Sequence, residues 1–299
     1  MKMHLRMNPL SLGIVLLTIF GLLAVFIYSR PLRITHRTIV WKQGTLGLIV
    51  PVYWYGSITS LIKISEAGVP TIAVINLASA TGPILYWNRT THAFQDAGVK
   101  TVGDVWTGYN SVPITTVERQ IRDYMRWYPD ISGIFLDGSS ASPSTSSYKY
   151  YEALYRYTKS LRKNALVIEN PGTWVPQQYL ERNGRNTSNI ILISENGAPY
   201  SMREMKFNTI PAWAHKYPRR RFAVIVHGAK RSQLLVFLKK LTVFEHAGWV
   251  YVTNEDEPNP YASLPSYWKM EIQFVEHVDS TNVRTPRNGP PYTREAFHK

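Results

Sequence analysis

Two acidic residues stand where apolar stretches of this 299-residue chain end. Asp137 closes "GIFLD" at residues 133–137, and Glu195 follows "ILIS" within the stretch 189–196. Cleavage of a glycosidic bond requires two facing carboxyl groups, because one protonates the leaving oxygen while the other attacks the sugar or activates water. We therefore predict that Asp137 and Glu195 are catalytic residues.

Both acids also have structural alternatives. Asp137 can cap the loop that it opens, since Gly138 and two serines follow it. Glu195 can be a buried glutamate paired with a basic neighbour. The elements that carry the two acids decide between these roles.

Eight short apolar runs, rich in β-branched residues, recur along the chain. They cover residues 46–53, 71–76, 99–106, 133–137, 165–170, 189–196, 221–227 and 248–254. Continuous apolar runs without polar alternation are typical of parallel strands that are covered on both faces.

Three intervening stretches have helical periodicity, at residues 115–128, 147–163 and 231–248, the last with Gly248 as its C-cap. This alternation predicts an α/β fold, a single (β/α)8 barrel over residues 44–277. A doubly wound open sheet is the alternative, but "VPVYWYGS" is not the glycine-rich first turn that such a fold favours.

Polar and aromatic side chains gather at the ends of the predicted strands, where barrel enzymes place their active sites. Aromatic faces can stack on the C–H faces of sugar rings, although each ring can equally belong to the core. Trp174 is a further stacking candidate of this kind. The predicted substrate-binding residues are Tyr53, Trp54, Asn76, Trp106, Tyr109, Asn170, Asn196, His227, Tyr251 and Asn254.

The sequence favours neither a metal site nor a bound cofactor. The chain has no cysteine, and its eight histidines form no spaced pair of ligands. A nucleophile elbow and a phosphate-binding loop are also missing from the sequence. We expect no metal and no cofactor.

The N-terminal residues predict a membrane anchor. Residues 7–29 carry no charge, and the nineteen residues 10–28 are almost wholly apolar. As a helix they would span about 28 Å, close to the thickness of a bilayer's hydrocarbon core. A cleaved signal peptide is the alternative. Basic residues on both sides of the segment leave its orientation open.

The net charge of +14 is concentrated at the two ends of the chain. Residues 1–42 carry six basic and no acidic residues, and residues 281–299 carry a net charge of +3. Such ends favour attraction to a membrane surface over nucleic-acid binding, for which the chain has no motif. We divide the chain into an anchor (1–29), a basic linker (30–43), the barrel, and a flexible basic tail (278–299).

Several segments together resemble the spherulation-specific family 4, also called spherulin-4. They are "LIVPVYWY", "TIAVIN", "NPGTWVPQQYL", "ILISEN" and "GWVYVTNEDEPNPYASLPSYW", in the family's order over residues 46–268. The resemblance implies a barrel related to glycoside hydrolases that cut α-1,4-linked galactosamine or N-acetylgalactosamine polymers. It also implies an extracytoplasmic setting, often behind an anchor.

By position, the resemblance implies that Asp137 is the nucleophile and Glu195 the general acid/base. The chain departs from the family pattern twice, with Gly138 where a glutamate is usual and Trp106 where a histidine is common. We expect Asp137, without an adjacent acid, to stay ionised, and Glu195 to have a raised pKa if it is desolvated.

We therefore expect a monomeric, membrane-anchored glycoside hydrolase that cleaves an exopolysaccharide or cell-wall polysaccharide with retention of configuration. The alternative, supported by Gly138, is a catalytically silent protein that binds polysaccharide or serves as a scaffold at the cell surface.

Overall fold

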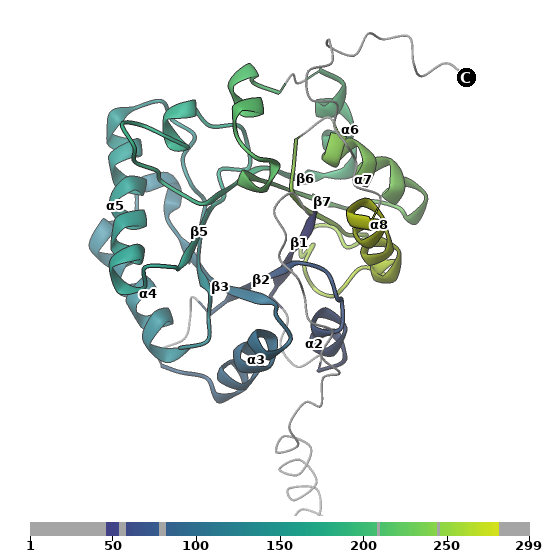
Figure 1. Ribbon diagram of the computed structural model, residues 1–299, viewed down its shortest axis with the longest axis horizontal. Coiled ribbons are helices and arrows are strands. Elements are labelled where there is room, and N and C mark those ends of the chain that lie inside the picture. The colour runs from purple at the N-terminus through teal and green to yellow at the C-terminus, as the bar shows by residue number, and fades with distance from the viewer. Residues whose placement is uncertain (1–45, 54–57, 78–81, 208–209, 244–245, 281–299) are drawn as a thin grey trace, which may run out of the picture. The chain divides into compact units, whose positions relative to one another are not determined.

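The computed structural model describes residues 46–53, 58–77, 82–207, 210–243 and 246–280. Eight parallel strands pair in chain order, and β1 pairs with β8 to close a barrel. Figure 1 shows the strands at the centre with the helices around them. The predicted (β/α)8 barrel is confirmed, and the open sheet is excluded. The strands are β1 (Gly47–Val52), β2 (Thr71–Asn76), β3 (Lys100–Trp106), β4 (Gly133–Asp137), β5 (Leu166–Glu169), β6 (Ile190–Gly197), β7 (Phe222–His227) and β8 (Trp249–Val252).

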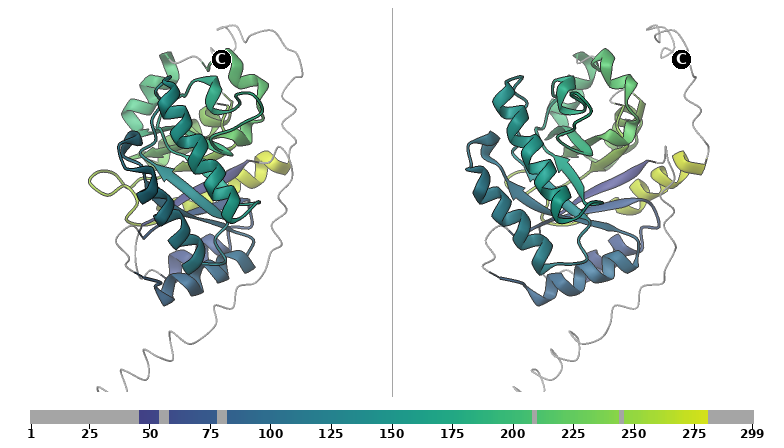
Figure 2. Two further views of the ribbon diagram at one scale, coloured as in Figure 1. Left: turned by 90° about the vertical axis from the view of Figure 1, so that its left-hand side faces the viewer. Right: turned by 60° about the vertical axis from the view of Figure 1, so that its left-hand side comes forward.

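The strands are buried along almost their whole length, and every residue of β1 and β8 is buried. Continuous apolar runs form strands here because helices cover the outer face of the barrel while strand side chains fill its interior. The side views show this outer layer packed along the strands (Figure 2). The described α-helices are α2 (Ile58–Ser65), α3 (Leu85–Asp96), α4 (Ile114–Trp127), α5 (Thr145–Leu161), α6 (Ala198–Phe207), α7 (Leu234–Val243) and α8 (Trp268–Ser280).

Helix α4 illustrates how the sequence specifies this layer. Pro113 stands at its N-cap, and its buried residues Val117, Ile121 and Tyr124 recur at the spacing of one helix face. The Tyr124 hydroxyl accepts a hydrogen bond of 2.7 Å from the backbone N–H of Leu77, which directly follows β2. The helix therefore fixes the carboxyl end of a strand that borders the barrel mouth.

The outer layer departs from strict strand–helix alternation between β5 and β6. This connection contains a short 3-10 helix, η2 (Gln177–Tyr179), where a regular barrel has an α-helix. Further 3-10 helices are η1 (Gly108–Asn110), η3 (Ala212–Lys216), η4 (Arg219–Arg221) and η5 (Arg231–Gln233).

The predicted helix at 231–248 is too long. Helix α7 ends at Val243, and Gly248 directly precedes β8 instead of capping a helix. A Cβ atom at Gly248 would lie 2.6 Å from the backbone nitrogen of Arg220. The glycine therefore serves a close approach of two backbone segments at the start of the strand.

The anchor, the linker and the stacking candidate Trp54 lie outside the described residues. Within the described part of the chain, no helix is long and apolar enough to cross a bilayer. Helix α8 continues to Ser280, so residues 278–280, predicted as the start of the tail, are helical. The remainder of the predicted tail also lies outside the described residues.

Candidate active site

The two predicted catalytic carboxylates line one cavity at the carboxyl ends of the strands. Asp137 is the last residue of β4, and Glu195 lies in β6, two residues before its end. The cavity has a volume of about 310 Å³. Its lining residues are Trp106, Tyr109, Asp137, Gly138, Asn170, Pro171, Gly172, Glu195, His227, Glu257, Pro260 and Tyr261.

The Asn170 side chain links the two acids. Its amide nitrogen, directly after β5, donates to Asp137 Oδ1 at 2.8 Å and to Glu195 Oε2 at 2.5 Å. Since both oxygens bond one nitrogen, they lie no farther apart than the sum of these distances, about 5.3 Å. Asp137 and Glu195 can therefore flank one small group of atoms.

Glu195 is held by partners from distant parts of the chain. A register shift between Leu192 and Ser194 in the pairing of β6 with β7 immediately precedes it. Such a bulge re-aims the side chains that follow, and it commonly occurs beside active sites. The hydroxyl of Tyr261, from the segment after β8, donates to Glu195 Oε1. In the left view of Figure 2 the yellow-green segment between β8 and α8 projects beyond the strands.

Burial raises the pKa of both carboxyl groups. For Glu195, the loss of hydration raises the pKa most and the charge of Asp137 adds to it, while the Tyr261 and Asn170 bonds oppose it. For Asp137, burial also raises the pKa, against hydrogen bonds from Asn170 and the Gly138 backbone. The raised pKa of Glu195 was predicted and suits a general acid. Asp137 was expected to be an isolated acid that stays ionised; it instead interacts with the charges of Asp104 and Glu195, and its burial raises its pKa and so works against ionisation.

A third carboxyl group, Asp104 of β3, lies beside these two acids and was missed from the sequence. Only 2 % of it is exposed, and its carboxylate accepts a hydrogen bond of 2.8 Å from the Asn76 amide. Burial raises the pKa of Asp104 to about 8, helped by the charge of Asp137 and opposed by bonds from Tyr53 and Asn76. Asp104 is therefore mostly protonated at neutral pH.

The loop after Asp137 stabilises its own turn and also borders the cavity. Gly138 has φ +56°, and the Ser139 hydroxyl donates to the Leu136 carbonyl at 2.7 Å. The Gly138 N–H bonds the Asp137 carboxylate, as a capping aspartate would arrange it. The same carboxylate also lines the cavity, so capping and exposure to a ligand are compatible at Asp137.

The structure brings together four of the predicted substrate-binding residues, namely Trp106, Tyr109, Asn170 and His227. The His227 ring lies 2.8 Å from the Asp256 carboxylate through Nδ1. Tyr53 and Asn76 stand behind the cavity lining, where both bond Asp104.

Other predicted residues do not line the cavity. Tyr251 lies inside β8 and is fully buried, so its ring belongs to the core. Asn196 bonds the Ser194 hydroxyl, and Asn254 accepts a bond from the Ser266 backbone and so orders its own loop.

Trp174 is also absent from the lining and packs in an aromatic cluster with Trp213 and Phe222. Phe222 is the first residue of β7, so this cluster reaches the opposite end of that strand from His227. The Trp174 ring is therefore a packing residue.

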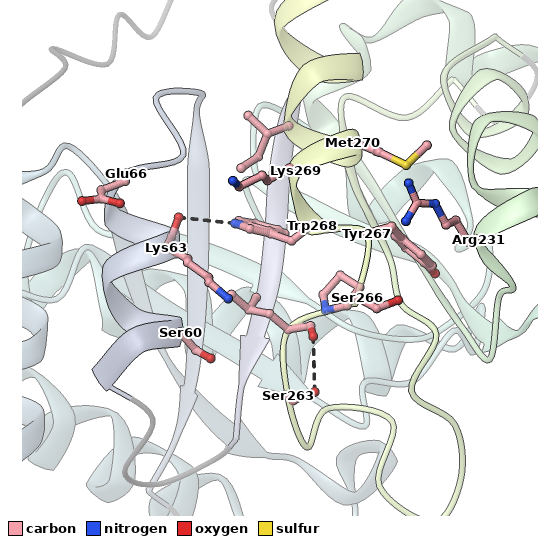
Figure 3. Close-up of a pocket in the computed structure, with 13 residues that line it drawn as sticks. Ser60, Lys63, Glu66, Arg231, Ser263, Ser266, Tyr267, Trp268, Lys269 and Met270 are labelled. Atoms are coloured by element: carbon pink, nitrogen blue, oxygen red, sulfur yellow. Dashed lines mark hydrogen bonds between the residues drawn. The ribbon is translucent and has the colours of Figure 1, made fainter.

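A larger cavity, about 650 Å³, lies between α2 and α8 and lacks the paired acids. Figure 3 shows Trp268 at its centre, with Lys63 and Lys269 beside it and Glu66 at the far edge. Among its thirteen described lining residues Glu66 is the single acid. Volume alone does not make a site, and the carboxylate pair identifies the smaller cavity as the candidate active site.

Within the described residues, no group of three or more histidine, aspartate or glutamate side chains is arranged to hold a metal ion. Asp104 accepts from the Asn76 amide, Asp137 and Glu195 both accept from the Asn170 amide, and Glu195 also accepts from the Tyr261 hydroxyl. Paired carboxyl groups of this kind are able to transfer protons and to attack as nucleophiles.

A closed (β/α)8 barrel with paired acids at the carboxyl ends of its strands places this chain in the class of barrels whose sites resemble those of glycoside hydrolases. Residues 47–277 match the Spherulation-specific family 4, and the chain belongs to that family.

Relatives agree with this assignment. The chain is 29% identical over 263 residues to Spherulin-4 of Physarum polycephalum, covering 83% of this chain and 75% of that protein. Among solved structures, Aspergillus clavatus Sph3 in complex with GalNAc superposes with a TM-score of 0.66 at 21% identity, over 78% of this chain and 98% of Sph3. The cyclic alpha-maltosyl-(1→6)-maltose hydrolase of Arthrobacter globiformis superposes with a TM-score of 0.50 at 11% identity, over 81% of this chain and 83% of the hydrolase. These similarities establish the shared barrel.

Proposed function

We propose that this protein is a retaining glycoside hydrolase acting on an aminosugar-containing polysaccharide of the α-1,4-galactosamine or N-acetylgalactosamine type. The observation that carries the proposal is the Asn170 amide, which bonds Asp137 and Glu195 at once. Carboxyl groups about 5–5.5 Å apart suit retention, and inversion requires about 6.5–9.5 Å to admit a water. The bound of about 5.3 Å between the bonded oxygens supports retention.

In the first step Asp137 attacks the anomeric carbon while Glu195 transfers its proton to the leaving glycosidic oxygen. The glycosidic bond breaks, an ester forms between the sugar and Asp137, and the leaving chain departs as an alcohol. In the second step Glu195 removes a proton from water, which attacks the anomeric carbon and releases Asp137. Tyr261 supports both steps, because its hydroxyl can donate to ionised Glu195 and accept from the protonated form.

The choice of sugar is supported by the family and by the ligand bound to one structural relative. Sph3 carries GalNAc in its crystal structure, and its barrel superposes on this one along almost the whole Sph3 chain. The lining of the cavity supports a sugar ligand, because Trp106 and Tyr109 contribute aromatic rings on which the C–H face of a sugar can stack.

Comparison of the wild type with Asp137→Asn and Glu195→Gln tests the function. We expect the wild type to release reducing ends from α-1,4-linked N-acetylgalactosamine or galactosamine polymer, and each variant to lose roughly 100-fold or more in rate. The Asn88→Ala variant, changed on α3 outside the cavity, serves as the control. Equal rates for wild type and both acid variants would remove the catalytic assignment.

A second function is favoured by one observation, the exposed aromatic rings beside a glycine at position 138. A protein with this cavity could hold polysaccharide without cutting it. Saturable binding of the polymer by the wild type with no release of reducing ends, at any pH from 4 to 9, would establish this function in place of hydrolysis.

We also propose that the apolar segment at residues 10–28 anchors the protein and that the barrel lies outside the cytoplasm as a monomer. The length of that segment and the basic residues on both sides of it support the anchor. Carbonate-resistant sedimentation together with protease accessibility on intact cells tests it. Release of the protein by carbonate, or protection from the protease, would contradict this placement.

A further inference from the structure

Two large aromatic side chains are exposed beside the catalytic acids. Trp106 ends β3, pairs in register with Asp137, and is 48% exposed, while Tyr109 is 61% exposed. Their rings meet edge to face, with centroids 5.7 Å apart. Apolar side chains of this size are usually covered, so an exposed pair at a cavity rim indicates a surface that a ligand covers.

The backbone under these rings is held in place by the strand that carries Asp137. The Tyr109 N–H donates to the Gly138 carbonyl at 2.6 Å, and the Thr107 hydroxyl donates to the same carbonyl at 2.8 Å. Tyr109 and Asn110 both have positive φ, 56° and 66°, which non-glycine residues adopt rarely. Such a conformation persists where surrounding bonds determine it, and it is common at ligand sites.

Gly138 makes room for the Trp106 ring. A Cβ atom at Gly138 would lie 2.3 Å from Trp106 Cζ3, closer than atoms can approach. An indole in this position and a side chain at 138 therefore exclude each other. The two positions at which the chain departs from the family pattern, 106 and 138, therefore depend on each other sterically.

We infer that Trp106, Tyr109 and Gly138 form an aromatic shelf, a sugar-binding subsite next to the bond that is cut. The shelf takes the apolar C–H face of a pyranose ring, which stacks on the indole while the adjoining ring reaches Asp137 and Glu195. The choice of an aminosugar ligand rests on the proposed function. The shelf adds to that function a surface that determines which sugar is bound. Gly138 acts as a positioning residue, since it touches the ring and not the sugar.

Binding can be measured apart from cleavage in an Asp137→Asn background, with α-1,4-linked N-acetylgalactosamine oligomers as the probe in calorimetry. We expect Trp106→Ala to weaken binding roughly tenfold and Trp106→Phe to weaken it less, because a smaller ring keeps part of the stacking. Tyr200→Ala is the matched control, since Tyr200 is also exposed and does not line the cavity. Unchanged affinity in Trp106→Ala would overturn the shelf.

The role of Gly138 follows from a double-mutant cycle in the same background. Gly138→Ala should weaken binding, because the new Cβ displaces the indole and also strains a backbone that has φ +56° at this position. Only the strain remains once Trp106 is alanine, so Gly138→Ala should cost less in the Trp106→Ala background than in the parent. Fully additive losses would contradict the coupling. Thermal melts identify any variant that does not fold. If Gly138→Ala does not fold, the affinity of Trp106→Ala alone tests the shelf.

The outcomes separate the shelf from the hydrolase proposal. Trp106-dependent binding by a wild type that releases no reducing ends would keep the shelf and refute hydrolysis. Hydrolysis by the wild type with an unchanged KM in Trp106→Ala, together with unchanged affinity, would refute the shelf and keep the enzyme.

Discussion

Tyr261 donates a hydrogen bond to Glu195, although 66 residues separate them in the chain. The phenol comes from the segment after β8, and the carboxylate comes from β6. This contact lowers the pKa of Glu195 against the larger effect of burial, which raises it. The proton affinity of the proposed general acid thus depends on a loop that closes over the barrel from its last strand.

The Tyr261→Phe variant should therefore have an altered pH profile. Loss of the hydrogen bond raises the pKa of Glu195 further, so the alkaline limb of kcat, where the acid loses its proton, should move to higher pH. The rate at the optimum should fall by roughly tenfold, since a hydrogen bond to a charged group contributes about 1.5–3 kcal/mol. A pH series of initial rates measures both effects, and an alkaline limb that stays in place or moves down would contradict this assignment.

Replacement of Asn170 tests the bridge between the acids. In Asn170→Ala both carboxylates lose a donor, so the pKa values of Asp137 and Glu195 should both rise and kcat/KM should fall about 10- to 100-fold at neutral pH. The acidic limb should also move to higher pH, because Asp137 then ionises later. Asn88→Ala removes an amide on α3 that bonds the Trp127 carbonyl outside the cavity, and it should keep wild-type kinetics. A similar loss in both variants would show that the effect is general and not due to the bridge.

Asp104 makes the stability of the barrel depend on pH. Its pKa is about 8 in the folded protein against 3.8 for an ordinary aspartate, so between these values the folded chain holds a proton that the unfolded chain releases. Stability from this group is therefore full below about pH 4 and falls by up to about 1.4 kcal/mol per pH unit as the pH rises toward 8.

Asp104→Asn removes this dependence, because its amide can replace the protonated acid between Asn76 and Tyr53. The difference in unfolding free energy, variant minus wild type, should therefore increase from pH 5 to pH 8 and level off above. Urea unfolding of both proteins across this range measures it. Parallel stability curves would show that Asp104 is ionised in the folded state.

The parts of this protein that follow a local pattern were predictable from its sequence. Buried parallel strands need continuous apolar runs, so the barrel could be recognised, and an acid that ends such a run, as Asp137 does, lies at the mouth by topology alone. Helix limits were less predictable, because the apolar stretch after residue 231 continues past Val243 without a sequence signal for the end of α7.

The rest of the site depends on contacts that spacing does not encode. Asp104 lies inside β3, two residues before its end. A single acid within the apolar run "TVGDVW" was the sequence signal for it, but the site residues were sought at the strand ends. Tyr261 lies in a loop whose path is set by packing, although its "NPY" segment was already conspicuous for the family resemblance. Tyr251 was wrongly predicted to bind substrate because an aromatic residue of a strand can face either the cavity or the core, and the Tyr251 side chain is fully buried.

The stereochemistry of the first product tests most directly whether Asp137 and Glu195 act together on one bond. Proton NMR of early hydrolysis of an α-1,4-linked N-acetylgalactosamine oligomer distinguishes the two anomers before they equilibrate. The account predicts that the α-anomer appears first, as two displacements at one carbon require. Initial release of the β-anomer would contradict the assignment, because a single displacement by water inverts the anomeric carbon and leaves no role for Asp137 as nucleophile.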